Sequence, residues 1–279
     1  FSASMQRIPN NVNKKTPKST VLHCMPIKSS IKNFEPSRQV LRKQIKLLSG
    51  GYFDRTAIKD GLITVYPWDV DHDAWFQQRL REPKPYAALW ELAGMLCNSN
   101  GCPVSKFPVG DINTILLVSR SIGLDGEVTY APTCTACGKT NQQSTIKIPD
   151  ELERISEKSD DYPGWDEFEL PASKDVVRLR PLTVGDEVAV AERDDSSRKL
   201  YPDRMIRILS PVLSVGGGVP EGPGELMAWW NALVPKDKYS FTTNQDLLYP
   251  HLNTEVNHEC DFCKAKFIHQ LNIGFEFFR

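Results

Sequence analysis

Four of the seven cysteines in this chain stand in two Cys-x-x-Cys pairs, Cys134/Cys137 and Cys260/Cys263. Two cysteines three residues apart in a tight turn can direct both sulfurs at one metal ion. Four thiolates complete the closed tetrahedral shell of a structural Zn²⁺ ion, with Zn–S distances near ~2.3 Å. Strand-like segments flank each pair, and Gly138 follows the first pair directly, as in a zinc knuckle. We therefore expect these four cysteines to bind one structural zinc ion.

The two pairs are separated by 122 residues. A shared ion would link the first pair to the C-terminal part of the chain and enclose residues 175–250 as a helical insertion. Two alternatives stay open, namely reduced cysteines without a metal and an independent redox motif at each pair. A catalytic zinc would need an open position for water, but four cysteines already fill the shell. The nearby His258 and His269 are not expected ligands, and we expect His258 to face solvent.

Other motifs give no support for catalysis or for a further cofactor site. The sequence contains no Gly-x-Ser-x-Gly, no His-Glu-x-x-His and no dinucleotide-binding fingerprint. The acidic run 69–73 resembles a metal-binding loop, but it stands where a helix N-cap belongs. The glycine-rich segment 216–224 lacks the Gly-Lys-Ser/Thr of a phosphate-binding loop. We predict a protein that is not an enzyme, with no catalytic and no cofactor-binding residues.

Composition and charge divide the chain unevenly. The 279 residues are 40% hydrophobic and 25% charged, which is typical of a globular protein, and no apolar run approaches the roughly 20 residues of a membrane span. Residues 1–48 contain ten basic residues against Glu35 alone, a charge of +9, which leaves −10 for residues 49–279. The odd number of cysteines and the polar first residues favour a reducing compartment. We expect an extended basic arm over 1–48 and a single body over 49–279.

The body reads as an α+β fold that is mainly helical. Strands are predicted at 62–66, 127–133, 143–148, 175–182, 255–260 and 264–273. Helices are predicted near 37–48, 74–80, 86–96, 112–122, 200–214, 224–234 and 242–249, and a further helix begins at Thr183. Asp71 or Asp73 is the expected cap of the helix at 74–80. Asp111 is the expected cap of the helix at 112–122, with Gly123 just beyond its end. Residues 126–149 and 254–275 should pair as a small zinc-ribbon-like β unit.

The order of motifs along the chain resembles a known family. It runs from Phe-Pro-Val-Gly-Asp111 and Ile-Leu-Leu-Val-Ser-Arg120 through Cys-x-x-Cys-Gly138 and Val-Arg-Leu-Arg-Pro-Leu182 to the late Cys-x-x-Cys pair and a terminal Phe-Phe. This order is similar to that in the baseplate hub and hub-assembly proteins of T-even-type contractile-tailed bacteriophages. The resemblance covers roughly residues 60–279. The basic arm and the long Gly/Pro segment 216–224 depart from it.

The resemblance implies a structural role and a metal-binding cysteine set, which maps onto Cys134, Cys137, Cys260 and Cys263. It implies a virion protein of the tail baseplate that is assembled in the host cytoplasm. The implied partners are hub, spike and tape-measure proteins in a symmetric, multi-copy assembly, with no membrane. The choice between a virion component and an assembly factor stays open.

The main alternative is a zinc-ribbon nucleic-acid-binding factor. The cysteine pairs and the +9 arm favour it, whereas the −10 body opposes it. The knuckles carry few basic residues beyond Lys139, Lys264 and Lys266. Nucleic acid is therefore not the expected partner.

Overall fold

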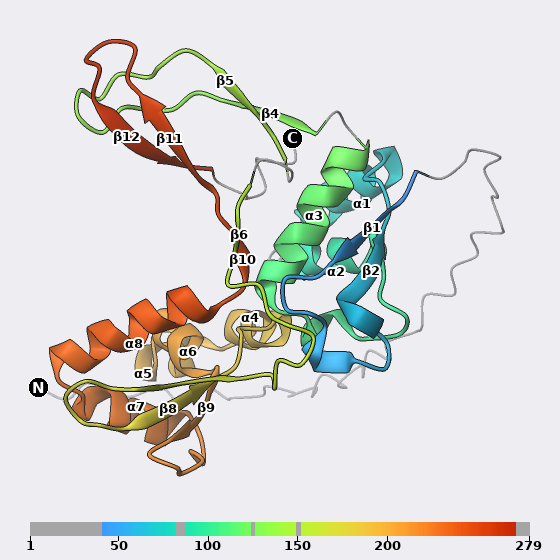
Figure 1. Cartoon of the computed structure of the whole chain (residues 1–279). Coiled ribbons are helices and arrows are strands. Elements are labelled where there is room, and N and C mark those ends of the chain that lie inside the picture. Colours follow the sequence, from blue (N-terminus) through green and yellow to red (C-terminus); the bar gives the residue numbers. More distant parts are fainter. Residues whose placement is uncertain (1–40, 82–86, 124–125, 149–151, 272–279) are drawn as a thin grey trace, which may run out of the picture. The chain divides into compact units, whose positions relative to one another are not determined.

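A computed structural model describes residues 41–81, 87–123, 126–148 and 152–271. All of them belong to one compact unit, Val40–Arg279. Within the described residues the chain forms eight α-helices and five small antiparallel sheets, which confirms the expected mixture of helices and strands (Figure 1). None of the described helices combines the length and the hydropathy needed to cross a membrane. The arm before residue 41 and the terminal phenylalanines lie outside the described residues.

The first sheet has the order β1-β2-β3, with β1 at Lys43–Lys46, β2 at Leu62–Val65 and β3 at Cys97–Asn98. The helix predicted at 37–48 is wrong in its described part, because Ile45 pairs with Ile63 in the strand ladder. Ile45 is the buried residue of this strand, so the pairing with β2 prevails over the helical spacing of the apolar residues. The boundary expected at residue 48 is therefore too late, since β1 already belongs to the body.

Three helices supply nine of the twenty buried residues in the apolar cluster around the first sheet, which we call the first core. They are α1 at Val70–Arg79, α2 at Ala88–Met95 and α3 at Val109–Gly123. Asp69 caps α1, where its side chain accepts hydrogen bonds from the backbone N–H groups of residues 71 and 72. The acidic run is thus a helix cap, but the cap lies two residues before the earlier of the predicted positions.

Helix α3 differs from its prediction at both ends. It begins at Val109, so Asp111 lies in the first turn and does not cap the helix. Its carboxylate is fully buried and accepts hydrogen bonds from the backbone N–H and the hydroxyl of Ser49. Gly123 is the last helical residue, and a Cβ there would lie 2.2 Å from the carbonyl oxygen of Trp68. The glycine is therefore required by close backbone packing and not by a left-handed helix end.

The segment after residue 151 contains the second three-stranded sheet and five helices. The sheet has the order β7-β8-β9, with β7 at Asp166–Glu169, β8 at Val176–Leu179 and β9 at Val212–Val215. The helices are α4 at Val184–Ala191, α5 at Asp195–Leu200, α6 at Asp203–Leu209, α7 at Pro223–Ala232 and α8 at Pro235–Leu248. Apolar side chains of this sheet, of α6 and of α7 cluster with the buried ring of Phe241 on α8.

Within this segment, the structure confirms one predicted helix start and corrects one predicted helix end. Thr183 and Asp186 form the predicted capping box at the start of α4. The helix predicted over 200–214 ends at Leu209, because residues 212–215 form β9 against β8. The expected helical insertion at 175–250 is thus a mixed helix and strand region.

Four further strands form two hairpins around the cysteine pairs. One hairpin joins β4 at Glu127–Tyr130 to β5 at Ser144–Lys147, and the other joins β11 at Glu255–Glu259 to β12 at Lys266–Gln270. A two-stranded ladder of β6 at Arg154–Ile155 and β10 at His251–Leu252 precedes the second hairpin. Each predicted segment thus forms a hairpin over its described residues, but the two hairpins are separate two-stranded sheets and share no strand ladder.

Candidate metal centre

The two Cys-x-x-Cys turns, which we call the first knuckle (residues 134–138) and the second knuckle (residues 260–264), have the same backbone hydrogen bonds. In the first, the N–H of Gly138 donates to the carbonyl of Cys134 over 2.9 Å; in the second, the N–H of Lys264 donates to the carbonyl of Cys260 over 3.0 Å. Gly138 and Lys264 both have positive φ, at 71° and 62°. The sequence thus encodes the same turn twice, with glycine in the left-handed position only once.

The knuckles bring all four predicted sulfurs together. Each Sγ atom lies within 4.8 Å of the others, and no other cluster of potential metal ligands occurs among the described residues. Two distances join the knuckles, 3.7 Å from Cys134 to Cys263 and 3.7 Å from Cys137 to Cys260. A tetrahedral ion with Zn–S bonds of ~2.3 Å separates its sulfurs by about 3.8 Å. The donor atoms therefore fit a tetrahedral thiolate site.

The electrostatics of the cluster favour a cation. Backbone N–H groups of Cys263 and Phe262 point at the sulfur of Cys260 and lower its pKa to about 6. The N–H of Ala265 acts in the same direction on Cys263, but the sulfurs of the other three cysteines raise its pKa to about 11. Thiols crowded in this way resist joint deprotonation, and a bound divalent cation removes that resistance.

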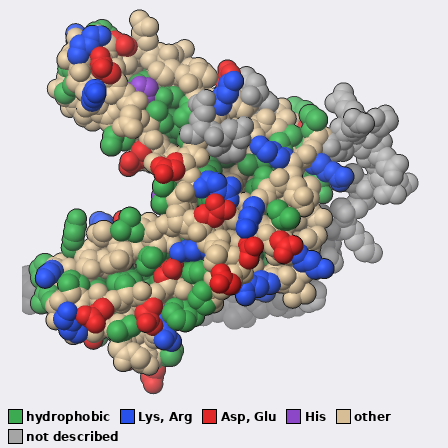
Figure 2. All heavy atoms as spheres, viewed as in Figure 1, with side chains coloured by type: hydrophobic (Ala, Val, Ile, Leu, Met, Phe, Trp, Pro, Cys, Tyr) green, Lys and Arg blue, Asp and Glu red, His purple; other side chains and the backbone are tan. Residues whose placement is uncertain are grey.

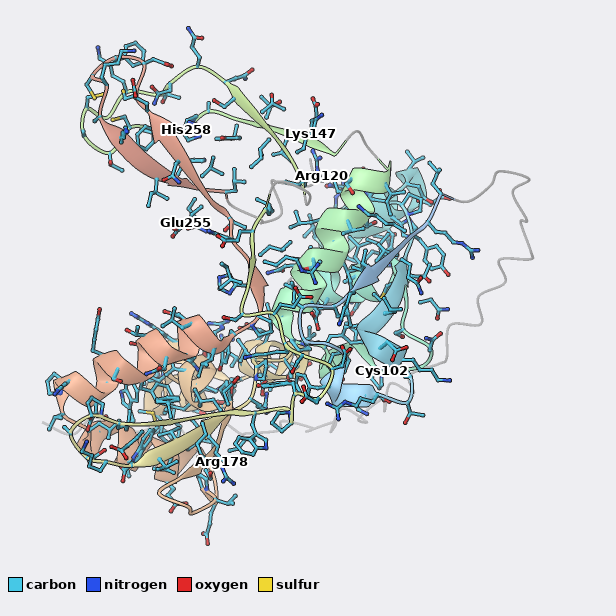
Figure 3. The ribbon with its side chains drawn as sticks, in the orientation of Figure 1. Cys102, Arg120, Lys147, Arg178, Glu255 and His258 are labelled. Carbon is cyan, nitrogen blue, oxygen red and sulfur yellow. The ribbon has the colours of Figure 1, made fainter. Side chains whose placement is uncertain are left out.

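The inner faces of the two hairpins pack against each other beside the sulfurs. The hydroxyl of Tyr130 on β4 lies 2.7 Å from Nε2 of His258 on β11, and the Tyr130 ring stacks on His269 at 5.2 Å. His258 is labelled in Figure 3. It is half-buried, so the prediction that it faces solvent is wrong. Burial, with a smaller contribution from His269, lowers the pKa of His258. Both histidines belong to the contact between the hairpins.

A second contact between the knuckles is not predicted from the sequence. Asp261 accepts a hydrogen bond from the backbone N–H of Gln142 over 3.0 Å, and its own N–H donates to the side chain of Asn141 over 2.7 Å. The ammonium of Lys139 lies 4.9 Å from the centre of the Phe262 ring. The sequence signal available for this contact is the polar residue Asp261 inside the second knuckle and the polar residue Asn141 shortly after the first knuckle. These contacts join the knuckles through groups other than the sulfurs.

The other end of the β unit joins the body through apolar packing. Buried residues of both hairpins share one cluster with the body, namely Leu48, Leu117, Val128, Ile146, Ile148, Leu152, Leu252 and Leu271. Arg120 on α3 donates to the carbonyl of Glu127 at the start of β4 over 3.4 Å (Figure 3). The cysteine cluster therefore lies at the far end of hairpins whose other end packs against the body.

The remaining sequence candidates form no comparable site. Cys97 and Cys102 are buried in the first core and do not belong to the sulfur cluster. The glycine-rich segment makes a tight turn in which the N–H groups and carbonyls of Val215 and Gly218 pair. Cys24 lies outside the described residues.

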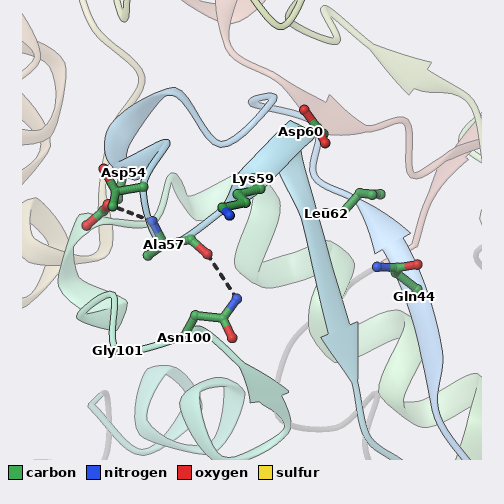
Figure 4. Close-up of a pocket in the computed structure, with 9 residues that line it drawn as sticks. Gln44, Asp54, Ala57, Lys59, Asp60, Leu62, Asn100 and Gly101 are labelled. Carbon is green, nitrogen blue, oxygen red and sulfur yellow. Dashed lines mark hydrogen bonds between the residues drawn. The ribbon is translucent and has the colours of Figure 1, made fainter.

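A polar hollow of about 680 Å³ lies beside the first sheet. Asp54 accepts a hydrogen bond from the N–H of Ala57, whose carbonyl accepts one from the side chain of Asn100 (Figure 4). The side chains of Lys59 and Asp60 are spread along the turn and do not meet at one point (Figure 4). We assign no chemistry to this hollow.

Comparisons with family models, with curated proteins and with solved structures returned no match for this chain.

Proposed function

We propose that this protein is a non-enzymatic docking protein in which one structural zinc ion links two distant parts of the chain. The supporting observation is that four cysteine sulfurs from residues 134–137 and 260–263 lie within 4.8 Å of one another. Thiolates suit Zn²⁺, and four of them leave no open position for a catalytic water. Metal binding is coupled to folding, so the ion would fix the relative positions of the two hairpins.

We further propose that the docking takes place in the baseplate hub of a contractile phage tail, near the spike and tape-measure proteins and in several symmetric copies. The support is the order of motifs described above, together with two physical features. The metal centre gives a rigid unit, and the body exposes large apolar side chains, among them Val70, Val219 and Tyr239. Exposed apolar side chains suit contacts with neighbouring proteins in an assembly.

The location is tested on purified phage tails. Quantitative mass spectrometry of tails and of isolated baseplates should find the protein in a fixed ratio to the hub proteins. A protein that is required for assembly but is missing from finished tails would be an assembly factor. A protein found only outside tails, with no effect of its deletion on baseplates, would contradict the proposal.

The alternative of a nucleic-acid-binding factor rests on the basic residues before position 49. The β unit itself offers little attraction to phosphates. Its lysines at 139, 147, 264 and 266 are matched in number by carboxylates at 127, 255, 259 and 261. A zinc ion with four thiolates adds a net charge of −2. On the face drawn in Figure 2, basic and acidic side chains are interspersed. Affinity for DNA or RNA that falls steeply with salt would favour the alternative.

A further inference from the structure

We propose that the four cysteines are also a modification site, at which oxidation replaces the metal link with two disulfides between the knuckles, Cys134–Cys263 and Cys137–Cys260. The inference rests on the proposed role of the cluster as a link between distant segments. It adds that the link survives when the protein passes from a reducing to an oxidising environment.

The distances between the sulfurs favour disulfides between the knuckles. The two pairs that join the knuckles each have Sγ atoms 3.7 Å apart. A small movement therefore brings each pair to the ~2.05 Å of an S–S bond. Each pair also combines one exposed cysteine, Cys137 or Cys263, with one buried cysteine, Cys260 or Cys134. The exposed sulfur is open to an oxidant, and the buried sulfur lies next to it as the second reactant.

Contacts other than the metal also join the two knuckles. Asp261 bonds to residues 141 and 142 of the other knuckle region, and Tyr130 bonds to His258 across the hairpins. These contacts are in place at the moment when the metal leaves, so sulfurs of different knuckles then lie 3.7 Å apart. Disulfides within each Cys-x-x-Cys turn would instead form no cross-link between the two knuckles.

The chemistry needs a peroxide as the oxidant. An exposed thiolate attacks one oxygen of hydrogen peroxide, the O–O bond breaks, and a sulfenic acid and a hydroxide ion result. The neighbouring thiolate then attacks the sulfenic sulfur and expels a second hydroxide ion, which forms the S–S bond. Two peroxides oxidise four thiolates to two disulfides and yield four hydroxide ions, and the metal leaves as a hydrated divalent cation.

The test treats the full-length, zinc-loaded protein with hydrogen peroxide. A chromogenic chelator records released zinc, and mass spectrometry of unreduced peptides records the disulfides. Asp-N protease cleaves before Asp261 and so separates Cys260 from Cys263, and fragmentation of the linked peptides between Thr135 and Ala136 distinguishes Cys134 from Cys137. We expect zinc release together with peptides that join Cys137 to Cys260 and Cys134 to Cys263. Predominant Cys134–Cys137 and Cys260–Cys263 bonds, or cysteines oxidised without any bond, would overturn the inference.

Two variants complete the test. In Cys137→Ser the bond between Cys134 and Cys263 should still form and Cys260 should stay reduced, whereas Cys102→Ser should leave the wild-type pattern unchanged. If Cys137→Ser does not fold, the wild-type peptide pattern alone decides the pairing. Failure of the two proposals is distinguishable. Reduced protein without zinc that still forms both cross-knuckle disulfides contradicts only the metal, and zinc-loaded protein that forms other disulfides contradicts only this inference.

Discussion

The region around α3 and the β unit around the cysteines are stabilised by different means. The first core, to which α3 contributes, contains twenty buried apolar residues among the described part of the chain. The small core next to the metal centre contains three, and two of these are the cysteines Cys134 and Cys260. Its only other buried member is Phe267. Apolar burial of this size does not offset the entropy of ordering two hairpins.

The difference between the two cores indicates which region depends on the metal for its stability. The body should fold on its apolar core whether or not zinc is present, whereas the tip of the β unit should depend on the ion. The exposed ring of Phe262, with 56% of its surface accessible, shows how little apolar area the second knuckle buries. Small units with such cores generally use metals or disulfides for stability.

The largest expected effect comes from removing one ligand in each knuckle. Cys134→Ser and Cys260→Ser should each abolish stoichiometric zinc binding and lower the melting temperature of the β unit by a similar amount, about 10 °C. Metal analysis and calorimetry measure both quantities. A variant pair in which only one substitution releases the metal would show that the knuckles do not share an ion.

Shortening a buried side chain in the body should lower the stability of the protein without releasing the metal. Leu116 on α3 is fully buried in the first core, so Leu116→Ala should destabilise the protein by about 3 kcal/mol through cavity formation. Its zinc content should stay at the wild-type level. Denaturant unfolding and metal analysis test this, and loss of zinc in this variant would mean that the two regions are not independent.

The buried carboxylate of Asp111 should give the body a pH dependence of its own. Burial raises the pKa of Asp111 to about 6, despite the hydrogen bonds from Ser49 that lower it. The folded state therefore holds this proton more tightly than the unfolded state, and the stability gained is present below about pH 4 and lost as the pH rises through 6.

Asp111→Asn should remove about 1 kcal/mol from the fall in unfolding free energy between pH 5 and pH 7. Urea unfolding at both pH values, on the wild type and the variant, measures the difference. An identical pH dependence in the two proteins would show that Asp111 titrates normally.

The smallest expected effect concerns the contact between the hairpins. Tyr130→Phe removes the hydroxyl that lies 2.7 Å from His258 but keeps the ring stacked on His269. The loss should be about 1 kcal/mol or less, with zinc binding retained. Tyr130→Ala also removes the ring and should cost more. Equal effects of the two substitutions would contradict a separate contribution from the hydroxyl.

Each Cys-x-x-Cys turn and the hairpin around it could be predicted from local patterns. Each Cys-x-x-Cys pair fixes a tight turn, and the alternation of residues around Val128 and Phe267 fixes which strand faces are buried. The Thr183 capping box is equally local. Such features depend on residues a few positions apart, which the sequence displays directly.

Features that depend on distant partners could not be predicted. The segment 43–46 has spacing compatible with a helix, and only its pairing with β2 makes it a strand. Asp111 looks like a cap until Ser49, 62 residues away, is placed against it. The Asp261 contact likewise depends on Asn141, which lies 120 residues earlier. In each case a tertiary contact overrides a plausible local pattern.

The most direct test of the account is the metal content of the purified, reduced full-length protein, measured by inductively coupled plasma mass spectrometry together with native mass spectrometry. We predict one zinc ion per chain, lost completely in Cys134→Ser and in Cys260→Ser. Two ions per chain, or none in protein purified without chelators, would contradict a single shared metal centre.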